Sequence, residues 1–584
     1  MWHYEPPLRD IRFVTEELLN LPAQWAHLPA HAELDVDTAR QVIDEAAKFA
    51  AEVIAPLNAS GDLEGCTLRD GEVTTPHGYR EAYQAFVKAG WPALACDPKV
   101  GGQGLPHAVN AVLHEMLNSA NHAWNMYPGL LHGAYECLML HGTPELKARY
   151  LAKIVSGEWL STMCLTEAHA GTDLGLLKTR AEPQADGSYR IRGTKIFISG
   201  GEHDLSDNIV HMVLARITDA PAGTKGLSLF LIPKFLPGDT PDGTRNALRC
   251  DGLEKKMGIK GSATCVMNFD GATGWLVGEP HRGMAGMFVM MNAARLHVGL
   301  QGVGHAESAY QNSLRYAMER MQMRAPLRPA ERSNEPADPI VLHPAMRHKL
   351  LRQRALLEGG RLLAYESSHL LDVAEQHPDA TVRHTAHDQV SLLTPIIKAF
   401  LTDNGFAAAH TAQQIFGGHG YMHDFGAEQC VRDSRISLIY EGTNEIQAID
   451  LLLRKVLPDG GAKLAALIER LQAELPRSEL APRAQAALAQ WQEITRHIAH
   501  HAGSDPELPY RVADDYLRLA GLALLAQGWV RADAVAARGS SPFYAAKRET
   551  ARYYLDFVLP EAGLCVARIH AGQNPLPYLL PVSA

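Results

Sequence analysis

A single carboxylate stands between a tyrosine and a glycine in the segment LIYEGTNEIQ, residues 438–447. This residue, Glu441, directly follows an apolar run, and burial in apolar surroundings would raise the pKa of its carboxyl group and make the carboxylate a stronger base. Gly442 beside it lets another group approach the backbone closely. Taken alone, the segment fits an exposed glutamate at the start of a helix at least as well as a general base.

A second segment with chemical potential is MCLTEAHAGTDLG, residues 163–175, which is rich in small and hydroxyl-bearing residues. Its small residues permit close approach to the backbone, and the hydroxyls of Thr166 and Thr172 can donate or accept hydrogen bonds. A ligand-binding loop and an ordinary turn both fit this composition.

Other kinds of catalytic site lack their sequence signatures. The glycine-rich stretches at 99–106 and 416–426 do not contain the G-x-G-x-x-G fingerprint, and no Walker A motif occurs. His114-Glu115 lacks the second histidine of H-E-x-x-H, and the two imidazoles of HTAH, residues 384–387, have no further candidate ligand. No G-x-S-x-G elbow is present. We therefore expect no Rossmann fold, no metal site and no serine-nucleophile triad.

Bulk composition narrows the partners and the compartment. The chain has 584 residues, and its 55 Lys and Arg against 65 Asp and Glu leave a net charge of −10, which argues against binding to nucleic acid or anionic lipid. Eight scattered cysteines without a C-x-x-C pair suit free thiols in a reducing compartment. No signal peptide and no membrane-spanning apolar run is apparent, so a cytoplasmic protein of bacterial type, without membrane association, is expected.

The periodicity of apolar residues divides the chain into four parts. Helical patterns dominate residues 1–160, short alternating or β-branched runs occupy 161–282, and the 3.6-residue period returns over 283–456 and again over 457–584. The main strands of the second part are expected at 189–201, 208–217, 226–235 and 265–278. The predicted fold class is mixed and mainly α, with a helical N-terminal domain, a central β domain, a helical bundle and a helical C-terminal extension.

Six motifs in the same order resemble those of the acyl-CoA dehydrogenase family, and the resemblance covers most of the chain. The motifs are MCLTEAHAGTD (163–173), KIFISGG (195–201), ARLHVGLQGVG (294–304), MERMQMR (318–324), QIFGGHGY (414–421) and RDSRISLIYEGTNEIQ (432–447). Their separations also match the family pattern, with 25 residues from Arg295 to Arg320 and 27 from Gln414 to Glu441. The N-terminal segment and the long tail are similar to those of a larger bacterial subgroup that acts on medium- or long-chain acyl-CoAs or on 3-(methylthio)propanoyl-CoA.

The resemblance implies an FAD-dependent enzyme with Glu441 as its base. Glu441 would remove the α-proton of an acyl-CoA thioester while the β-hydrogen leaves as hydride to the flavin, which gives a trans-2-enoyl-CoA. The backbone N–H of Glu441 and a flavin hydroxyl would stabilise the charge that develops on the thioester oxygen. A few relatives carry the base just before the helix arginine instead; here Ala294 occupies that position, so Glu441 has no competitor.

The resemblance also assigns cofactor and substrate contacts. The residues expected to hold FAD are Thr166, Thr172, Phe197, Ser199, Arg320, Gln322, Gln414, Gly418, Thr443 and Glu445. Arg320 would reach the FAD of a neighbouring subunit, because a guanidinium suits a diphosphate. The residues expected near the acyl-CoA are Asn292, Arg295 and Gly442, with Arg295 mainly ordering the loop that carries the base.

Several positions depart from the family pattern. Ala168-His169 replaces the usual Pro-Gly of the flavin loop, and Met323 replaces a frequent Phe. Glu445 stands where Gln is common, so its carboxylate should point away from the diphosphate. Asn292 stands where an Asp often meets the CoA, and it can still bond there with less charge assistance.

Partners and alternatives follow from the same resemblance. Electrons would pass to an electron-transfer flavoprotein in fatty-acid β-oxidation or related acyl-CoA catabolism, and a homo-oligomer is implied. The C-terminal extension favours a dimer over a tetramer. An acyl-CoA oxidase with the same fold and base and a non-catalytic flavin-binding scaffold are the alternatives. Fatty acyl and 3-(methylthio)propanoyl substrates both stay open.

Overall fold

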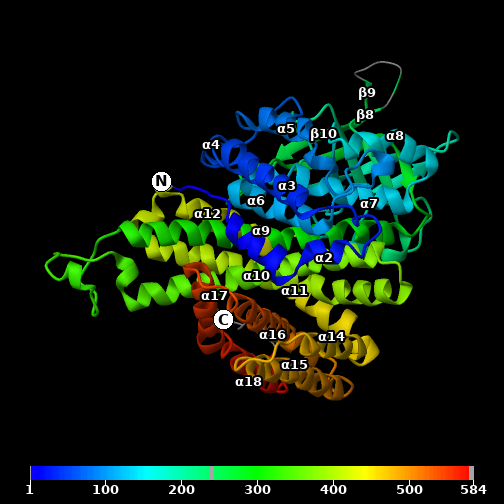
Figure 1. Ribbon diagram of the computed structural model, residues 1–584. Coiled ribbons are helices and arrows are strands. Elements are labelled where there is room, and N and C mark those ends of the chain that lie inside the picture. Colours follow the sequence, from blue (N-terminus) through cyan, green and yellow to red (C-terminus); the bar gives the residue numbers. More distant parts are fainter. Residues whose placement is uncertain (1, 237, 239–242, 578–584) are drawn as a thin grey trace, which may run out of the picture.

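Long helices run through the middle of the molecule, with the β strands and the N-terminal helices on one side and the C-terminal helices on the other (Figure 1). The computed structural model describes residues 2–236, 238 and 243–577. Helices far outnumber strands along the chain, and the strands cluster between two helical regions. The predicted mixed, mainly α fold class is therefore confirmed. The four domain limits stay predictions.

Amphipathic helices form most of the N-terminal part. They are α1 (Leu8–Arg12), α2 (Leu21–Trp25), α3 (Val36–Lys48), α4 (Leu57–Glu64), α5 (Tyr79–Lys88), α6 (His107–Asn125), α7 (Leu131–His141) and α8 (Pro144–Val155). The short antiparallel strands β1 (Thr67–Arg69) and β2 (Glu72–Thr74) interrupt them. Sequence interpretation missed this hairpin, because strands of three residues are too short to show an alternating pattern.

The central strands close on themselves. They are β3 (Trp159–Cys164), β4 (Arg180–Pro183), β5 (Tyr189–Ser199), β6 (Asn208–Ile217), β7 (Leu227–Pro233), β10 (Leu248–Leu253) and β11 (Thr264–Val277). Because β7 pairs with both β6 and β11, the strands β11, β5, β4, β6 and β7 form a ring, and β10 and β3 extend it. Pairing is antiparallel except where β6 meets β3 and β4. The strand β5 is part of this ring and ends at Ser199, and this end lies within the second of the six motifs.

Three long helices form the bundle, and two shorter ones lie before and after the loop of Glu441. They are α9 (Gly283–Glu319), α10 (Pro344–Gln376), α11 (Ala380–Phe416), α12 (Ala427–Arg435) and α13 (Asn444–Ile449), and α13 continues as a π-helix over Asp450–Val456. A Cβ on Gly302 would lie 2.4 Å from the Leu401 carbonyl oxygen, and one on Gly405 would lie 2.4 Å from that of Gly302. Only glycines let α9 and α11 cross this closely, and Arg295 of α9 lies beside the loop of Glu441.

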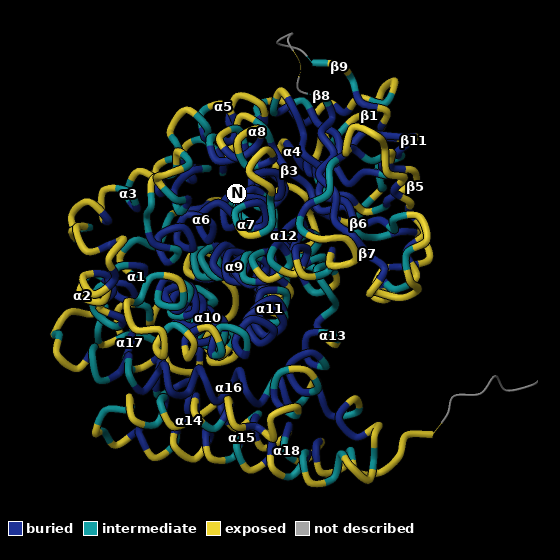
Figure 2. Tube along the Cα trace, turned by 90° about the vertical axis from the view of Figure 1, so that its right-hand side faces the viewer, coloured by how far each residue is buried: buried dark blue, intermediate teal, exposed yellow. Residues whose placement is uncertain are grey.

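The C-terminal extension packs on the bundle face away from the strands (Figures 1 and 2). Its helices are α14 (Ala462–Ala473), α15 (Ala481–Ala502), α16 (Leu508–Ala536), α17 (Pro542–Tyr553) and α18 (Glu561–Ala571). The Trp529 indole of α16 donates to the Ala355 carbonyl oxygen of α10 at 3.0 Å. In the tube coloured by burial, α16 is dark blue where it meets the bundle, so the extension covers that face.

Buried charges join the N-terminal part to the bundle. The fully buried Arg361 of α10 donates to Glu115 of α6 at 2.7 and 2.8 Å and to Asp10 of α1 at 2.6 Å, and it also bonds Glu307 of α9. Removing one partner of such a set leaves an uncompensated charge, which costs roughly 3–5 kcal/mol. This network fixes α6 against α9, the two helices that flank the candidate base.

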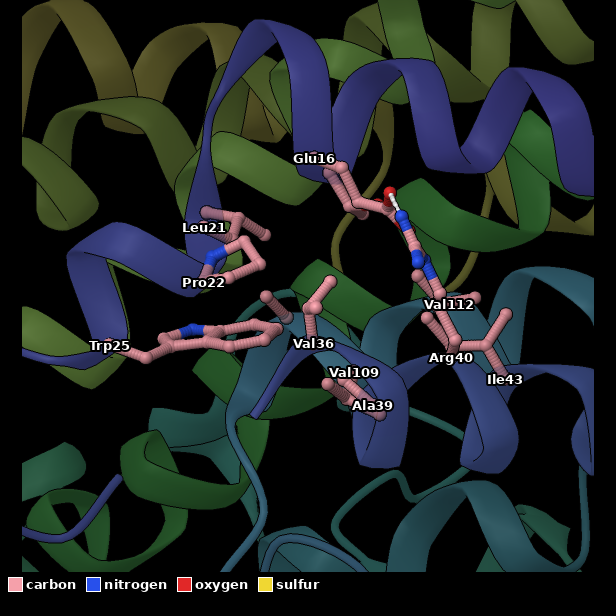
Figure 3. A pocket seen from close by; sticks show the side chains of 12 residues that line it. Glu16, Leu21, Pro22, Trp25, Val36, Ala39, Arg40, Ile43, Val109 and Val112 are labelled. Carbon is pink, nitrogen blue, oxygen red and sulfur yellow. Dashed lines mark hydrogen bonds and ion pairs between the residues drawn. The ribbon is translucent and has the colours of Figure 1, made fainter. Parts of the chain in front are cut away.

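One crevice in the N-terminal part is a packing gap with room for little more than a water molecule. Its volume is about 10 Å³, and apolar side chains such as Trp25 and Ile43 surround it beside the Glu16–Arg40 ion pair (Figure 3). Among the described residues, none of the helices combines the length and apolar character needed to cross a bilayer.

Candidate active site

Glu441 lies in a tight loop just before α13. Its φ of 57° and the φ of 84° at Gly442 place two successive residues in the left-handed region. A Cβ on Gly442 would lie 2.7 Å from the side-chain nitrogen of Gln447, so a glycine is required there for space as well as conformation. A non-glycine residue pays about 1–2 kcal/mol for this conformation. The surroundings must hold Glu441 in place.

Three side chains hold the loop by its carbonyl groups. Gln447 donates to the Glu441 carbonyl oxygen at 3.0 Å, and the Arg295 Nε donates to the same oxygen at 3.4 Å. The Lys398 ammonium donates to the Gly442 carbonyl oxygen and to the Asn444 side chain, both at 2.8 Å. Strained backbone that persists because its surroundings over-determine it is concentrated at functional sites.

Electrostatics around Glu441 act in two directions. Burial raises the pKa of Glu441, while the nearby Arg295 and Lys398 cations lower it. Burial also lowers the pKa of Lys398 to about 7, although Glu441 counters that effect. Arg295 is buried as well and lies 3.8 Å from the Asp450 carboxylate. The carboxylate is thus more basic than in water and is flanked by two cations.

A small cavity of about 30 Å³ lies beside Glu441. Side chains and backbone of α6, α9 and the loops after α6 and before α13 surround it: Asn118, Asn125, Met126, Gly129, Leu130, Ala294, His297, Val298, Gln301, Tyr440 and Glu441. Within the described residues, no backbone acceptor takes the N–H of Glu441. Glu441 therefore lines this cavity and has a backbone N–H without a backbone acceptor among the described residues.

A cavity about ten times larger, of about 320 Å³, lies on the other side of α9. Asn292 and Arg295, both expected near the acyl-CoA, line it, and His297 lines both cavities. The larger cavity reaches the surface at the exposed Asn292 and His387. Lys455 bridges its wall by donating to the Ser391 hydroxyl at 2.9 Å. It has room for an elongated polar group.

A buried ion pair fixes the shape of the predicted flavin loop, residues 163–175. Lys195 of β5 lies 2.9 Å from the Glu167 carboxylate and donates to the Leu165 carbonyl oxygen at 2.9 Å. Burial raises the pKa of Glu167, but Lys195 and the Thr179 hydroxyl lower it to about 2. The Ile196 N–H also bonds the Thr166 carbonyl oxygen at 2.9 Å. The loop therefore keeps its shape beside the end of β5.

The loop and the end of β5 offer groups that suit a flat ligand with polar edges. Within the described part of the chain, no hydrogen bond engages the hydroxyls of Thr166, Thr172 and Ser199. Phe197 is 58% exposed and has a left-handed φ of 60°. Thr443 caps α13, and the exposed Glu445 has a pKa lowered chiefly by the Thr443 hydroxyl. A strained, exposed aromatic ring among free hydroxyls fits an isoalloxazine.

The remaining predicted cofactor residues gather at the far end of the bundle. The Tyr316 ring of α9 stacks on Phe416 of α11 with centroids 4.2 Å apart, so the two helix ends are neighbours. Arg320 and Gln322 follow α9, and Gln414 and Gly418 stand at the end of α11, all four exposed. Nothing lies within 4 Å of a Cβ built on Gly418. This open, cationic end fits a diphosphate.

The predicted cofactor residue Arg320 does not meet the loop of Glu441 within one chain. Arg295 and Arg320 lie on one helix or at its end, 25 residues apart, and at 1.5 Å per residue that separation is roughly 38 Å. The structure brings Arg295, Gly442 and Glu441 together, while Arg320 stands far from them.

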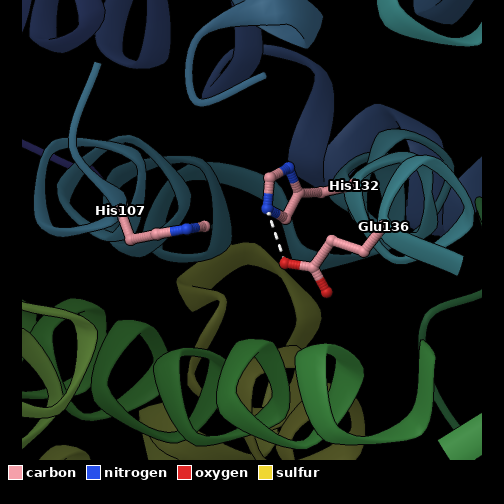
Figure 4. Close-up of side chains that lie close together, drawn as sticks. All are labelled: His107, His132 and Glu136. Carbon is pink, nitrogen blue, oxygen red and sulfur yellow. Dashed lines mark ion pairs between the residues drawn. The ribbon is translucent and has the colours of Figure 1, made fainter. Parts of the chain in front are cut away.

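A histidine–glutamate cluster lies at the inner end of the larger cavity. His107, His132 and Glu136 present ligand atoms within 4.8 Å of one another (Figure 4). Each imidazole has a carboxylate partner, since His132 lies 3.0 Å from Glu136 and His107 lies 3.2 Å from Glu375. Burial lowers the pKa of His107, but Glu375 raises it to about 9. Ion pairs account for this cluster, which the sequence patterns did not single out.

Several residues that shape the site escaped sequence reasoning. Lys398, Gln447 and the Glu167–Lys195 pair hold the two loops, and Asn118 lines the small cavity. A lone lysine inside the apolar run PIIKAFL was the available signal for Lys398, because lysine is rarely buried without a partner.

Comparison with known proteins matches most of the chain to one protein family. Family models describe residues 36–158, 162–272 and 281–456 as the N-terminal, middle and C-terminal domains of acyl-CoA dehydrogenase, and 461–577 as an acetyl-CoA dehydrogenase C-terminal-like domain. The chain is 43% identical to a 3-methylmercaptopropionyl-CoA dehydrogenase of Ruegeria pomeroyi, over 97% of this chain and 98% of the relative.

Two further relatives agree. A broad-specificity linear acyl-CoA dehydrogenase of Mycobacterium tuberculosis is 36% identical over 81% of this chain and 78% of its own length. The crystal structure of an acyl-CoA dehydrogenase complexed with FAD from Bacillus anthracis has the same fold, with a TM-score of 0.74 and 21% identity over 96% of this chain and 91% of that one. This chain belongs to the acyl-CoA dehydrogenase family, as an FAD-dependent oxidoreductase that acts on the CH–CH bond of an acyl-CoA.

Proposed function

We propose that Glu441 is the base that removes the α-proton of an acyl-CoA thioester, which is converted to a trans-2-enoyl-CoA. The observation that carries the proposal is the placement of Glu441, a half-buried carboxylate in a left-handed loop that Gln447, Arg295 and Lys398 hold beside a cavity. A general base must reach its proton in a fixed geometry. These three contacts supply that geometry.

The surroundings of Glu441 also adjust its basicity. Burial raises its pKa, which strengthens the carboxylate toward a weakly acidic α-proton. Arg295 and Lys398 oppose this effect, because each cation favours the ionised carboxylate. After proton transfer, the neutral carboxylic acid can keep the same half-buried position, because burial penalises only the charged form.

The free N–H of Glu441 is suited to the thioester oxygen. As the α-proton leaves, negative charge develops on that oxygen, and a fixed donor stabilises it more in the transition state than in the ground state. Glu441 lies before α13, and its N–H has no backbone acceptor among the described residues. The base and the donor then come from one residue.

The larger cavity suits the CoA part of the substrate. Its lining residues extend from α6 and α7 to α11, and it opens at Asn292 and His387. Lys455 places a cation in its wall. A pantetheine amide can bond Asn292 or the Ser391 hydroxyl, and Lys455 can pair with a phosphate. We assign Asn292 to CoA binding and Arg295 chiefly to the loop of Glu441.

The flavin contacts are proposed in two groups. Thr166, Thr172, Phe197 and Ser199 would hold the ring system, together with Thr443. When bound, FAD supplies the acceptor for the hydride that leaves Cβ. Glu445 is exposed and already interacts with Thr443, which suits a carboxylate that must avoid the diphosphate.

The second group implies a homo-oligomer. Arg320, Gln322, Gln414 and Gly418 lie together at the far end of the bundle, so they would complete the flavin site of a neighbouring copy. The C-terminal extension covers the bundle face that lies away from the strands. That face is therefore unavailable for contacts with further copies, which favours a dimer.

The electron acceptor and pathway follow from the family. We infer that an electron-transfer flavoprotein reoxidises the enzyme in the cytoplasm, and that the reaction belongs to fatty-acid β-oxidation or related acyl-CoA catabolism. Direct formation of peroxide during turnover would instead identify an acyl-CoA oxidase.

An anaerobic absorbance titration of the purified holoenzyme tests the reaction. The panel runs from butyryl-CoA to stearoyl-CoA and includes 3-(methylthio)propanoyl-CoA, because the Ruegeria relative is named for that thioester. Loss of the flavin absorbance with at least one acyl-CoA, and recovery of a trans-2-enoyl-CoA, is the expected result. A flavin band that no acyl-CoA changes would contradict the proposal.

A further inference from the structure

Four ionisable side chains from three helices meet in the wall of the larger cavity. His107 begins α6, His132 and Glu136 stand four residues apart on α7, and Glu375 lies in the last turn of α10. Ligand atoms of the first three lie within 4.8 Å of one another (Figure 4), and Glu375 lies 3.2 Å from the His107 Nε2. Two imidazoles and two carboxylates form a donor set that suits divalent transition-metal ions.

The contact between His132 and Glu136 has the length of a hydrogen bond but not its geometry. The His132 Nε2 lies 3.0 Å from a carboxylate oxygen of Glu136. That nitrogen is buried and has no hydrogen-bond partner among the described residues. Ligand atoms around a tetrahedral zinc ion lie roughly 3.4 Å apart and point at the ion rather than at each other. The two groups are thus spaced like two ligands of one metal ion.

The ring of His132 is held from its other nitrogen. The His132 Nδ1 lies 3.9 Å from the sulfur of the buried Cys96, and the His107 ring meets the His132 ring edge-on with centroids 5.2 Å apart. A proton on Nδ1 can be donated to the sulfur, which leaves the electron pair of Nε2 for a metal ion. Histidines that bind metals are commonly oriented by a group at the second ring nitrogen.

The charges of the cluster suit the exchange of protons for a divalent ion. Burial lowers the pKa of His107, but Glu375 raises it to about 9. Burial also lowers the pKa of His132, but Glu136 helps to raise it well above its usual value. Two imidazolium ions then offset two carboxylates. A divalent ion bound to two neutral imidazoles carries the same charge, so it can replace the two protons without leaving the carboxylates unpaired.

A metal ion can reach this cluster from solvent. The side chain of Glu375 is 49% exposed, and the two imidazoles are each 12% exposed. The cavity that they line reaches the surface at the exposed Asn292 and His387. The donor atoms are therefore enclosed on most sides but open to exchange through the cavity.

We propose that His107, His132 and Glu136 bind a divalent transition-metal ion of the zinc class, with Glu375 as the fourth ligand, and that the bound ion competes with acyl-CoA for the larger cavity. Zinc suits this set, because it accepts nitrogen and oxygen ligands in a tetrahedron. The competition rests on the proposed function, which assigns the larger cavity to CoA. An ion in its wall takes up room that the pantetheine needs.

The first experiment measures zinc binding to the holoenzyme. The protein is treated with a chelator, equilibrated with buffered zinc and analysed for its metal content. One zinc ion per chain is expected at this site, with a dissociation constant of about 1 μM or lower. Cobalt(II) in place of zinc should give the visible absorption of a tetrahedral complex. In His132→Ala, the affinity for zinc should fall at least about tenfold.

His384→Ala is the matched control. His384 also stands four residues before a carboxylate on one helix and lies 3.6 Å from that carboxylate, of Asp388. It is exposed and belongs to no cluster of three ligands among the described residues. This variant should bind zinc as tightly as the unaltered enzyme. FAD content and thermal unfolding show whether each variant folds, and Glu136→Gln, which keeps the shape of the side chain, provides a second variant if His132→Ala does not.

The second experiment measures the competition. With the acyl-CoA that reduces the flavin most efficiently, zinc at ten times its dissociation constant should raise KM about tenfold and leave kcat nearly unchanged. Addition of a chelator should restore KM. At the same zinc concentration, KM of His132→Ala should rise about twofold or less, whereas KM of His384→Ala should rise about tenfold.

Two results would overturn the inference. One is zinc binding that is as tight in folded His132→Ala or Glu136→Gln as in His384→Ala, and the other is a KM that saturating zinc does not raise. Neither result affects the reaction class. Failure of the proposed function would appear separately, as a flavin that no acyl-CoA reduces, and the metal analysis does not depend on that reaction.

Discussion

The two arginines that the sequence motifs single out on α9 have opposite surroundings. Arg295 is buried, lies 3.8 Å from Asp450 and donates to the carbonyl of Glu441. Arg320 is exposed at the end of the same helix, and its guanidinium pairs with no carboxylate of the described residues. Arg295 finds its partners within its own chain, whereas Arg320 presents an exposed cation without a carboxylate partner among the described residues.

This contrast separates the chemistry of the two ends. At the Arg295 end, burial and fixed hydrogen bonds can adjust a pKa and hold a strained loop, which a base requires. At the Arg320 end, an exposed guanidinium can form strong hydrogen bonds to a diphosphate. Without that ligand its charge is stable, because water solvates it. Substitutions at the first end should therefore change rate, and substitutions at the second should change cofactor retention.

The largest effect is expected at Glu441. Replacing the carboxylate with an amide in Glu441→Gln removes the base without removing the side chain's bulk, so kcat should fall by at least about a thousandfold. FAD content and acyl-CoA binding should stay near those of the unaltered enzyme. Rapid-mixing measurement of flavin reduction checks the rate. Residual turnover above a few per cent would assign the proton transfer to another group.

Lys398→Met should give the next largest effect. It removes the ammonium that holds the Gly442 carbonyl and Asn444, so the loop of Glu441 loosens, and kcat should fall roughly tenfold to a hundredfold. It also removes a cation that lowers the pKa of Glu441. Since the ionised carboxylate is the active form, kcat/KM rises with pH through this pKa, and the rising limb should move to higher pH in the variant.

A pH profile from about pH 5 to 9 tests Lys398 against a purely structural role. Lys455→Met provides the control, because Lys455 also bonds a neighbouring side chain but does not contact the loop of Glu441. It should leave the position of the limb unchanged. An unshifted limb in Lys398→Met would show that the ammonium does not act on the carboxylate.

At the other end of α9, Arg320→Ala should weaken FAD binding about tenfold and leave the rate of the loaded enzyme nearly unchanged. Arg320→Lys should recover only part of the affinity, since an ammonium cannot bind a diphosphate in bidentate fashion. Fluorescence titration of the apoprotein with FAD measures both. Arg324→Ala, at an exposed position four residues further on, is the control. Equal losses from both alanine variants would reduce Arg320 to general charge attraction.

Sequence patterns predicted the elements best where one local signal dominated. The run at 208–217 is apolar and rich in β-branched residues, and β6 occupies those ten positions. The strands β3 and β4 were missed, because β3 is short and fully paired with β6 and β4 carries charged residues at its exposed positions. Their existence depends on the partner strand more than on their own composition.

The candidate site could be predicted only in part for the same kind of reason. Glu441 stands in a motif, so its candidacy was visible in the letters. Lys398 and Asn118 lie at the site because of how α11 and α6 cross α9 and because α6 breaks at Asn121, and no local pattern encodes those angles. Crossing angles depend on packing along the whole helix.

The smallest effect is expected at Asn292, which precedes Arg295 on α9. Its side chain is exposed at the mouth of the larger cavity. A hydrogen bond from it to the CoA would also be exposed to solvent, so it would contribute about 0.5–1 kcal/mol to the binding free energy. Asn292→Ala should raise KM about threefold without changing kcat. Asn292→Asp separates two ways of binding, because a carboxylate can still accept a bond from a pantetheine amide but repels a phosphate. A lower KM for Asn292→Asp than for Asn292→Ala would place the pantetheine at this mouth. A KM higher than that of Asn292→Ala would place a phosphate there. The nucleotide end of CoA would then lie at the mouth of the larger cavity, beside Asn292 of α9.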